Sequence, residues 1–168
     1  MLKAILEILA TTPGKLRREI STLSRREMHD RPAPGKWSIQ EVLAHLADVE
    51  EISMRARVAA IIAEENPTLP AFDQEARAAE FRYHRIDPRR SLARLERQRR
   101  ANLRWLRKLR PAQLKRQAVH QTVGKISAEE LINEWAFHDL GHLKQILDIK
   151  RYALYSRIGN MRAFYELK

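Results

Sequence analysis

The chain has 168 residues, of which 44% are hydrophobic, and a formal net charge of +11. Length and composition are typical of one globular domain, and we expect a single domain over residues 1–168. Charged residues interrupt every long apolar stretch and no signal pattern opens the chain, so we expect no membrane-spanning segment and a cytoplasmic location. The absence of cysteine excludes disulfides and thiolate ligands, so any metal must be held by nitrogen or oxygen.

Arginine and lysine are concentrated between Arg85 and Arg116, where only Asp87 and Glu96 oppose them. Such a charge density is often a sign of nucleic-acid binding. Here the charges fall mostly on outer helical positions, and neither a nucleic-acid-binding motif nor a series of interleaved aromatic residues accompanies them. A solvated basic face is therefore favoured over a nucleic-acid site.

The first long helix is predicted over Leu2–Leu23, where apolar residues recur at helical spacing. The helix is expected to restart, with a kink, at Thr12-Pro13, because a proline suits a first helical turn. The turn-rich segment Arg31–Gly35 leads to a second helix, from Ser38 to about Glu65. Its start carries the serine and glutamate of a capping box, Ser38 and Glu41.

A long connection from Pro67 to Ile86 follows, and Asp73–Tyr83 could form a short helix within it. The third helix is predicted from Asp87-Pro88 to about Leu109, with the aspartate as N-cap and the proline in the first turn. The connection is long enough to let the second and third helices run in the same direction.

The fourth helix is predicted from Ser127 to about Tyr152, after a loop over Pro111–Ile126, and it too opens with a capping box. A short terminal helix over Met161–Leu167 is expected after Gly159. No segment shows the alternation of a strand, so the predicted fold class is all-α, a four-helix bundle. The moderate loop between the first two helices predicts that they are antiparallel neighbours.

Three histidines interrupt the apolar stripes that should face the core, His45 on the second helix and His138 and His142 on the fourth. The expected core positions are Val42, His45, Val49, Ile52 and Ala56 on the second helix, and Leu131, Trp135, His138, His142, Gln145 and Ile149 on the fourth. A spacing of four residues places two imidazoles about one turn apart on one face, as a single metal ion requires. In an antiparallel pair of helices the third histidine reaches a similar depth.

Any one of these histidines alone would be interpreted as a hydrogen-bonded core residue. Together they favour a divalent metal, zinc first, with nickel or iron(II) as alternatives. Three neutral imidazoles leave a coordination position for water or substrate, which distinguishes catalytic zinc sites from structural ones.

Three further polar residues are candidates for catalysis. Arg99 and Asn102 lie within the inner stripe of the third helix, where Arg99 could bind an anionic substrate group and Asn102 could orient it. The alternative is that Arg99 reaches the surface or pairs with a carboxylate. Asp139 occupies the position of the glutamate in an HExxH motif but is one methylene shorter, so we expect it behind the ligands or at the surface.

Several motifs resemble those of the DinB-like superfamily of small helical metalloproteins. They are WSIQEVLAHLADVE at Trp37–Glu50, FDQE at Phe72–Glu75, RRANL at Arg99–Leu103, VHQTVGKIS at Val119–Ser127 and FHDLGHLKQI at Phe137–Ile146. The resemblance covers nearly the whole chain and implies an up-down-down-up bundle with a long crossover between the second and third helices. It also implies a divalent metal held by His45, His138 and His142, often in a homodimer.

Relatives of this kind include S-transferases and isomerases that use bacillithiol or mycothiol, and candidate metal-dependent hydrolases. The resemblance therefore implies a metal-dependent enzyme acting on a small molecule. Transfer of a low-molecular-weight thiol to an electrophile is the favoured reaction, because the chain lacks a cysteine nucleophile of its own. The alternatives are a hydrolase, a non-catalytic metal-binding bundle, or a basic module that docks onto acidic partners.

Overall fold

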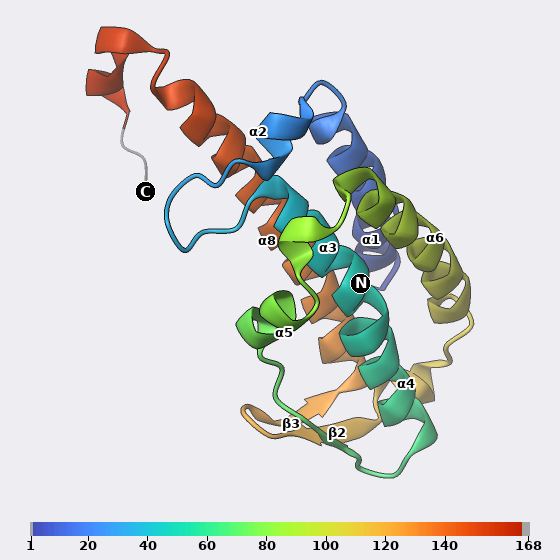
Figure 1. Cartoon of the computed structure of the whole chain (residues 1–168). Coiled ribbons are helices and arrows are strands. Elements are labelled where there is room, and N and C mark those ends of the chain that lie inside the picture. Colours follow the sequence, from blue (N-terminus) through green and yellow to red (C-terminus); the bar gives the residue numbers. More distant parts are fainter. Residues whose placement is uncertain (1, 166–168) are drawn as a thin grey trace.

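Four long helical rods dominate the computed structural model, which describes residues 2–165 (Figure 1). The rods are α1 (Leu2–Ile20); α3 (Ile39–Val49) continued by the π-helical segment η1 (Glu50–Arg55) and α4 (Ala56–Ala63); α6 (Pro88–Leu106); and α8 (Ala128–Tyr155). The shorter helices are α2 (Arg25–His29), α5 (Gln74–Glu80), α7 (Pro111–Leu114), and the 3-10 turns η2 (Tyr83–Arg85) and η3 (Gly159–Phe164). No helix among residues 2–165 is both long and apolar enough to cross a membrane.

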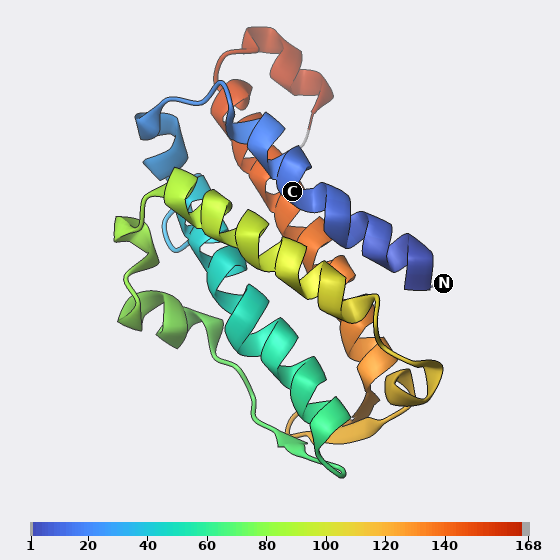
Figure 2. The ribbon, with the colours of Figure 1, turned by 90° about the vertical axis from the view of Figure 1, so that its right-hand side faces the viewer.

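The rods run up, down, down and up, which confirms the predicted four-helix bundle (Figures 1 and 2). Both α1 and α3 pack against α6 and α8. The prediction that the first two helices are neighbours is therefore wrong, since they occupy opposite corners of the bundle. The reason is that α2 and the segment after it carry the chain across the end of the bundle before α3 begins.

Helix starts follow the capping residues of the sequence. Ser38 and Ser127 each accept a bond from the backbone three residues on and complete capping boxes, and Asp87 caps α6 with Pro88 in the first turn. One start was not predicted. The first helix ends at Ile20, because Ser24 and Glu27 form a further capping box that begins α2.

The second rod departs from α-helical geometry at η1, where backbone bonds reach five residues back, as from Ala56 N–H to the Glu51 carbonyl. A π segment holds one residue more than the same length of α-helix would, so the buried stripe moves to later positions in the sequence. Ile52 and Ala56, predicted to face the core, are exposed, and Met54 and Val58 are buried instead. Glu50, the first residue of η1, is 1% exposed.

A small sheet closes one end of the bundle, contrary to the prediction of no strands. Its order is β1 (Thr68–Leu69), β2 (Gln117–His120) and β3 (Gly124–Ser127), with β1 parallel and β3 antiparallel to β2. Strands of two to four residues are too short to show an alternating pattern. Gly124 begins β3 with φ at +78°, which favours glycine.

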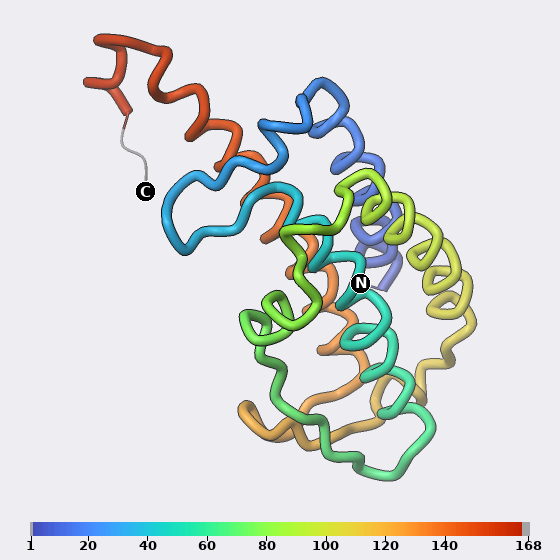
Figure 3. The backbone as a smooth tube through the Cα atoms, in the orientation of Figure 1, coloured from blue at the N-terminus to red at the C-terminus, as the bar shows by residue number. Residues whose placement is uncertain are grey.

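The crossover from α4 to α6 passes beside α3 (Figure 3), and its α5 and η2 parts are bonded to that helix. Asp73 caps α5, within the short helix predicted there. From α5, Arg77 donates to Asp48 at 2.7 Å, and the Tyr83 hydroxyl donates to the same carboxylate at 2.7 Å. The crossover is thus held against the helix that carries His45.

The buried side chains form two apolar clusters with a polar layer between them. One cluster includes Leu16, Val42, Leu95 and Ile146, and the other includes Leu9, Met54, Leu103 and Leu131. The polar layer contains the three histidines and a set of buried charges, as the interrupted stripes predicted. At the C-terminus the structure shows η3 in place of the predicted helix over Met161–Leu167, whose last residues lie outside the described part.

Candidate metal centre

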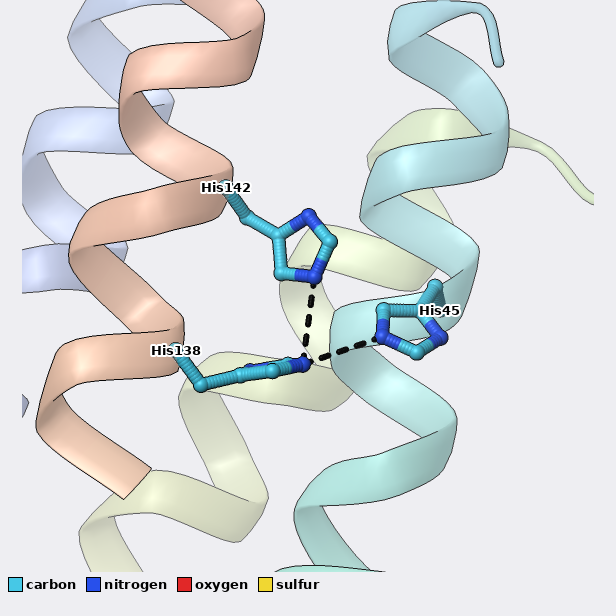
Figure 4. Close-up of side chains that lie close together, drawn as sticks. All are labelled: His45, His138 and His142. Carbon is cyan, nitrogen blue, oxygen red and sulfur yellow. Dashed lines mark hydrogen bonds between the residues drawn. The ribbon is translucent and has the colours of Figure 1, made fainter. Parts of the chain in front are cut away.

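The three predicted histidines converge at mid-height of the bundle (Figure 4). His45 projects from α3, and His138 and His142 project from successive turns of α8. The Nε2 atom of His138 lies 3.1 Å from Nε2 of His45 and 3.1 Å from Nε2 of His142, and the three nitrogens all lie within 4.8 Å of one another. His45 is 1% exposed, and the other two are mostly buried.

These nitrogens fit a divalent ion better than they fit a hydrogen-bonded cluster. His142 donates through Nδ1 to Oε1 of Gln145 at 2.7 Å, which leaves a lone pair on its Nε2. His138 Nε2 carries at most one proton, so it cannot form a good hydrogen bond with both neighbours at once. Imidazoles about 2.0–2.1 Å from one zinc ion have nitrogens about 2.9–3.4 Å apart, a range that includes the two 3.1 Å separations.

The environment keeps the imidazoles neutral. Burial, reinforced by the neighbouring His142 and His138, lowers the pKa of His45 to about 2. Burial likewise lowers the pKa of His138 to about 3, with contributions from His142 and from Arg99, and it lowers the pKa of His142. At neutral pH all three lone pairs are available for a metal.

In chelator-treated protein, we expect the free energy of unfolding to fall as the pH drops below about 6.5. The unfolded chain protonates His45 and His138 near their ordinary pKa, whereas the folded chain keeps both neutral down to about pH 3. The unfolded state therefore binds more protons, and each such histidine removes about 1.4 kcal/mol of stability per pH unit. Urea unfolding between pH 7 and 5 measures this slope.

The exposed histidines His29 and His84 give the control. A variant carrying glutamine at both positions should keep the slope of the wild-type chain. A free energy of unfolding that is flat from pH 7 to 5 would show that the buried histidines are not held neutral.

Below the triad, one buried arginine binds two carboxylates. Arg99 is 2% exposed and donates to both oxygens of Glu50, each at 2.8 Å, and to both oxygens of Asp139, at 2.5 and 3.0 Å. Asn102 and Trp135 complete the cluster, donating to Glu50 at 2.9 and 3.0 Å. Burial opposes the charge on Arg99, but the carboxylates of Asp139 and Glu50 more than offset it and raise the pKa of Arg99.

A proline in α1 supplies the last partner of this cluster. Pro13 lies inside α1 and has no N–H, so the Leu9 carbonyl one turn earlier lacks its helical donor. Arg99 donates to this carbonyl at 2.7 Å. At the predicted restart, Thr12-Pro13, α1 continues without interruption to Ile20. The carbonyl that the proline leaves unpaired is the point where α1 is bonded to α6.

The three predicted catalytic residues, Arg99, Asn102 and Asp139, therefore lie together in this buried cluster. Arg99 pairs with carboxylates, which is the alternative that its sequence position left open. Asp139 directly follows His138, so the cluster holds the turn of α8 from which that imidazole projects. These contacts support a role for the three residues in positioning the triad, and they do not support direct contact with a substrate.

Sequence reasoning missed Glu50. A glutamate five residues after His45 looks like an exposed flank of an α-helix. In the structure every residue of α3 from Ile39 to Val49 is buried, and Glu50 continues this fully covered stretch. The one available signal was that Arg99 and Asn102 interrupt the predicted inner stripe of the third helix, because an arginine in the core requires an acidic partner.

Comparison with known proteins agrees with this centre. The sequence profile of the DinB superfamily matches residues 8–146. The chain belongs to the DinB superfamily. Two candidate metal-dependent hydrolases of Oceanobacillus iheyensis are similar to it, at 29% identity over 84% of this chain and 80% of the relative, and at 28% over 82% and 78%.

YfiT of Bacillus subtilis, another candidate metal-dependent hydrolase, is 26% identical over 87% of this chain and 82% of its own length. A solved structure of YfiT, described as having an unusual four-helix bundle topology, matches with a TM-score of 0.83 at 25% identity, covering 90% of this chain and 86% of that one. Membership of the DinB superfamily and the three-histidine cluster together indicate a metal-dependent protein.

Proposed function

We propose that the chain is a metal-dependent enzyme that acts on a small molecule at the three-histidine centre. The observation that carries the proposal is the convergence of three neutral, mostly buried imidazole nitrogens, contributed by two helices, with two separations of 3.1 Å at His138 that suit one divalent ion. His45, His138 and His142 would hold the ion, with zinc preferred and nickel or iron(II) acceptable. A bound ion would lower the pKa of the nucleophile that it binds and polarise the substrate.

The protein groups near the triad narrow the chemistry. Asp139, the residue at the position of a general base in HExxH enzymes, has both oxygens engaged by Arg99. Asp48, one turn from His45, is engaged by Arg77 and Tyr83. Neither carboxylate is free to accept a proton, so the nucleophile must be one that loses its proton without help from these residues.

Two reactions meet this condition. The names of the similar proteins support hydrolysis, with water as the nucleophile. The engaged carboxylates favour a low-molecular-weight thiol, whose ordinary pKa of about 8.5 needs far less lowering than that of water. Transfer of such a thiol to an electrophile is therefore the other candidate reaction. It suits a chain that has no cysteine of its own.

The test is turnover by protein loaded with zinc, nickel or iron(II). One set of assays offers 4-nitrophenyl esters and amides in water, and a second offers a chlorodinitrobenzene electrophile with bacillithiol, mycothiol or cysteine. We expect metal-dependent turnover in one set and a loss of at least about 100-fold in the His138→Ala, His142→Ala variant. The His29→Ala, His84→Ala variant, altered at exposed positions, should keep the wild-type rate.

The two sets separate the candidates. Ester hydrolysis that needs no thiol supports the hydrolase, whereas turnover that requires a thiol supports the transferase. Metal-loaded protein that turns over neither set would contradict the proposal and leave a non-catalytic metal-binding bundle as the better explanation.

A further inference from the structure

A pocket of about 510 Å³ opens beside the metal centre, between the loop that precedes α3 and one face of α8. This volume is within the range of small-molecule sites. Its floor includes Trp37, Gln145 and Ile149, and Tyr152 stands at one side. Ile149 is buried, whereas Tyr152 is 47% exposed, so the pocket runs from an apolar floor to an open mouth.

Two of the residues that line the pocket, Trp37 and Gln145, also lie next to the histidines of the triad. The Trp37 ring lies 4.9 Å from the ring of His45 and is nearly parallel to that of His142, at 7° and 6.5 Å between centroids. Gln145 accepts from His142 at 2.7 Å. A molecule in the pocket therefore contacts Trp37, which lies against two of the imidazoles, and Gln145, which is bonded to His142.

The mouth of the pocket is predominantly cationic. Lys36 from the loop and Lys144 from α8 both line it, and Asp148 is the one acidic residue among its lining side chains. Lys144 is ion-paired with Asp148, and Arg151 reaches the same carboxylate at 3.4 Å. The pair is exposed, and such pairs contribute little, so Lys144 can exchange Asp148 for another anion at small cost.

We propose that this pocket binds the substrate of the metal centre, and that the substrate is a small anion. Its apolar or aromatic body would pack on Trp37 and Ile149, and its carboxylate or similar group would pair with Lys36 and Lys144. The inference rests on the proposed function for the link to the metal, but the binding preference can be measured without turnover. The net charge of +11 would also raise the association rate of an anion.

The test compares two ligands that differ only in charge, naphthalene-2-carboxylate and naphthalene-2-carboxamide, by calorimetry on the metal-loaded protein. We expect the carboxylate to bind at least about tenfold more tightly, as two charged hydrogen bonds would give. In the Lys36→Gln, Lys144→Gln variant this preference should largely disappear. Asp148→Asn removes the competing carboxylate, so it should raise the affinity for the carboxylate ligand about threefold.

Lys108 provides the matched control, because it is exposed just past the end of α6 and does not line the pocket. Lys108→Gln changes the net charge by the same amount as either pocket lysine and should leave both affinities unchanged. Equal binding of the two ligands, or a preference that survives in the double lysine variant, would overturn the proposal. The second result would indicate a carboxylate bound by the metal and not by the lysines.

Failure here and failure of the proposed function give different results. Metal-dependent turnover of neutral esters, with no charge preference in binding, would remove the substrate class and leave the enzyme. A charge preference that depends on Lys36 and Lys144, in protein without metal-dependent turnover, would leave an anion-binding pocket and remove the enzyme.

Discussion

We expect the purified chain to bind one divalent ion per molecule, and the His138→Ala, His142→Ala variant to bind essentially none. The remaining His45 offers a single nitrogen, and one imidazole does not hold a divalent ion against competition from buffer and chelator. Elemental analysis after dialysis should fall from about one equivalent to below about 0.1. The separations of 3.1 Å at His138 are the structural basis of this expectation.

The His29→Ala, His84→Ala variant should retain the ion, since both residues are exposed and distant in sequence from the triad. Circular dichroism should show the triad variant still helical, because two apolar clusters form the core without help from a metal. Unchanged metal content in the triad variant would contradict the assignment of the ligands. A largely unfolded variant would indicate a structural ion instead of a catalytic one.

Arg99→Met should destabilise the protein by about 3–5 kcal/mol, the usual cost of removing one partner from a buried ion pair. The change leaves Glu50 and Asp139 facing each other in the interior, 1% exposed each, and removes the donor of the Leu9 carbonyl. Arg99→Lys should recover only part of the loss, because one ammonium cannot bind two carboxylates through paired donors. Urea unfolding at pH 7 measures both changes.

Arg100→Met is the matched control, one position along the same helix. Arg100 is exposed and forms no ion pair with residues 2–165, so its loss should change the free energy of unfolding by less than about 0.5 kcal/mol. An Arg99→Met variant as stable as the Arg100→Met variant would show that the buried cluster contributes nothing net.

Much of the fold could be predicted from local signals. Ser38, Asp87-Pro88 and Ser127 begin helices because each supplies an acceptor for otherwise unpaired backbone N–H groups. The triad could be predicted because the spacing of His138 and His142 is a property of one helix. Both kinds of signal depend only on residues within a turn or two of each other.

What could not be predicted depends on contacts between distant segments. Two to four residues of strand become a sheet only when the crossover and the loop before α8 meet. The pocket combines Lys36, in a loop without periodicity, with one face of α8. The diagonal placement of α1 and α3 depends on the path that the chain takes through α2. The hydrophobic pattern of the sequence does not predict that path.

The surplus residue in η1 affects how this chain should be aligned with its relatives. Across Glu50–Arg55 the two halves of the second rod are out of phase by one residue, or about 100° of helical rotation. A relative with an unbroken α-helix here would need a single-residue gap inside the helix, a position where alignments normally forbid one. Without the gap, its sequence would match His45 and its neighbours correctly and then pair exposed residues with the buried Met54 and Val58.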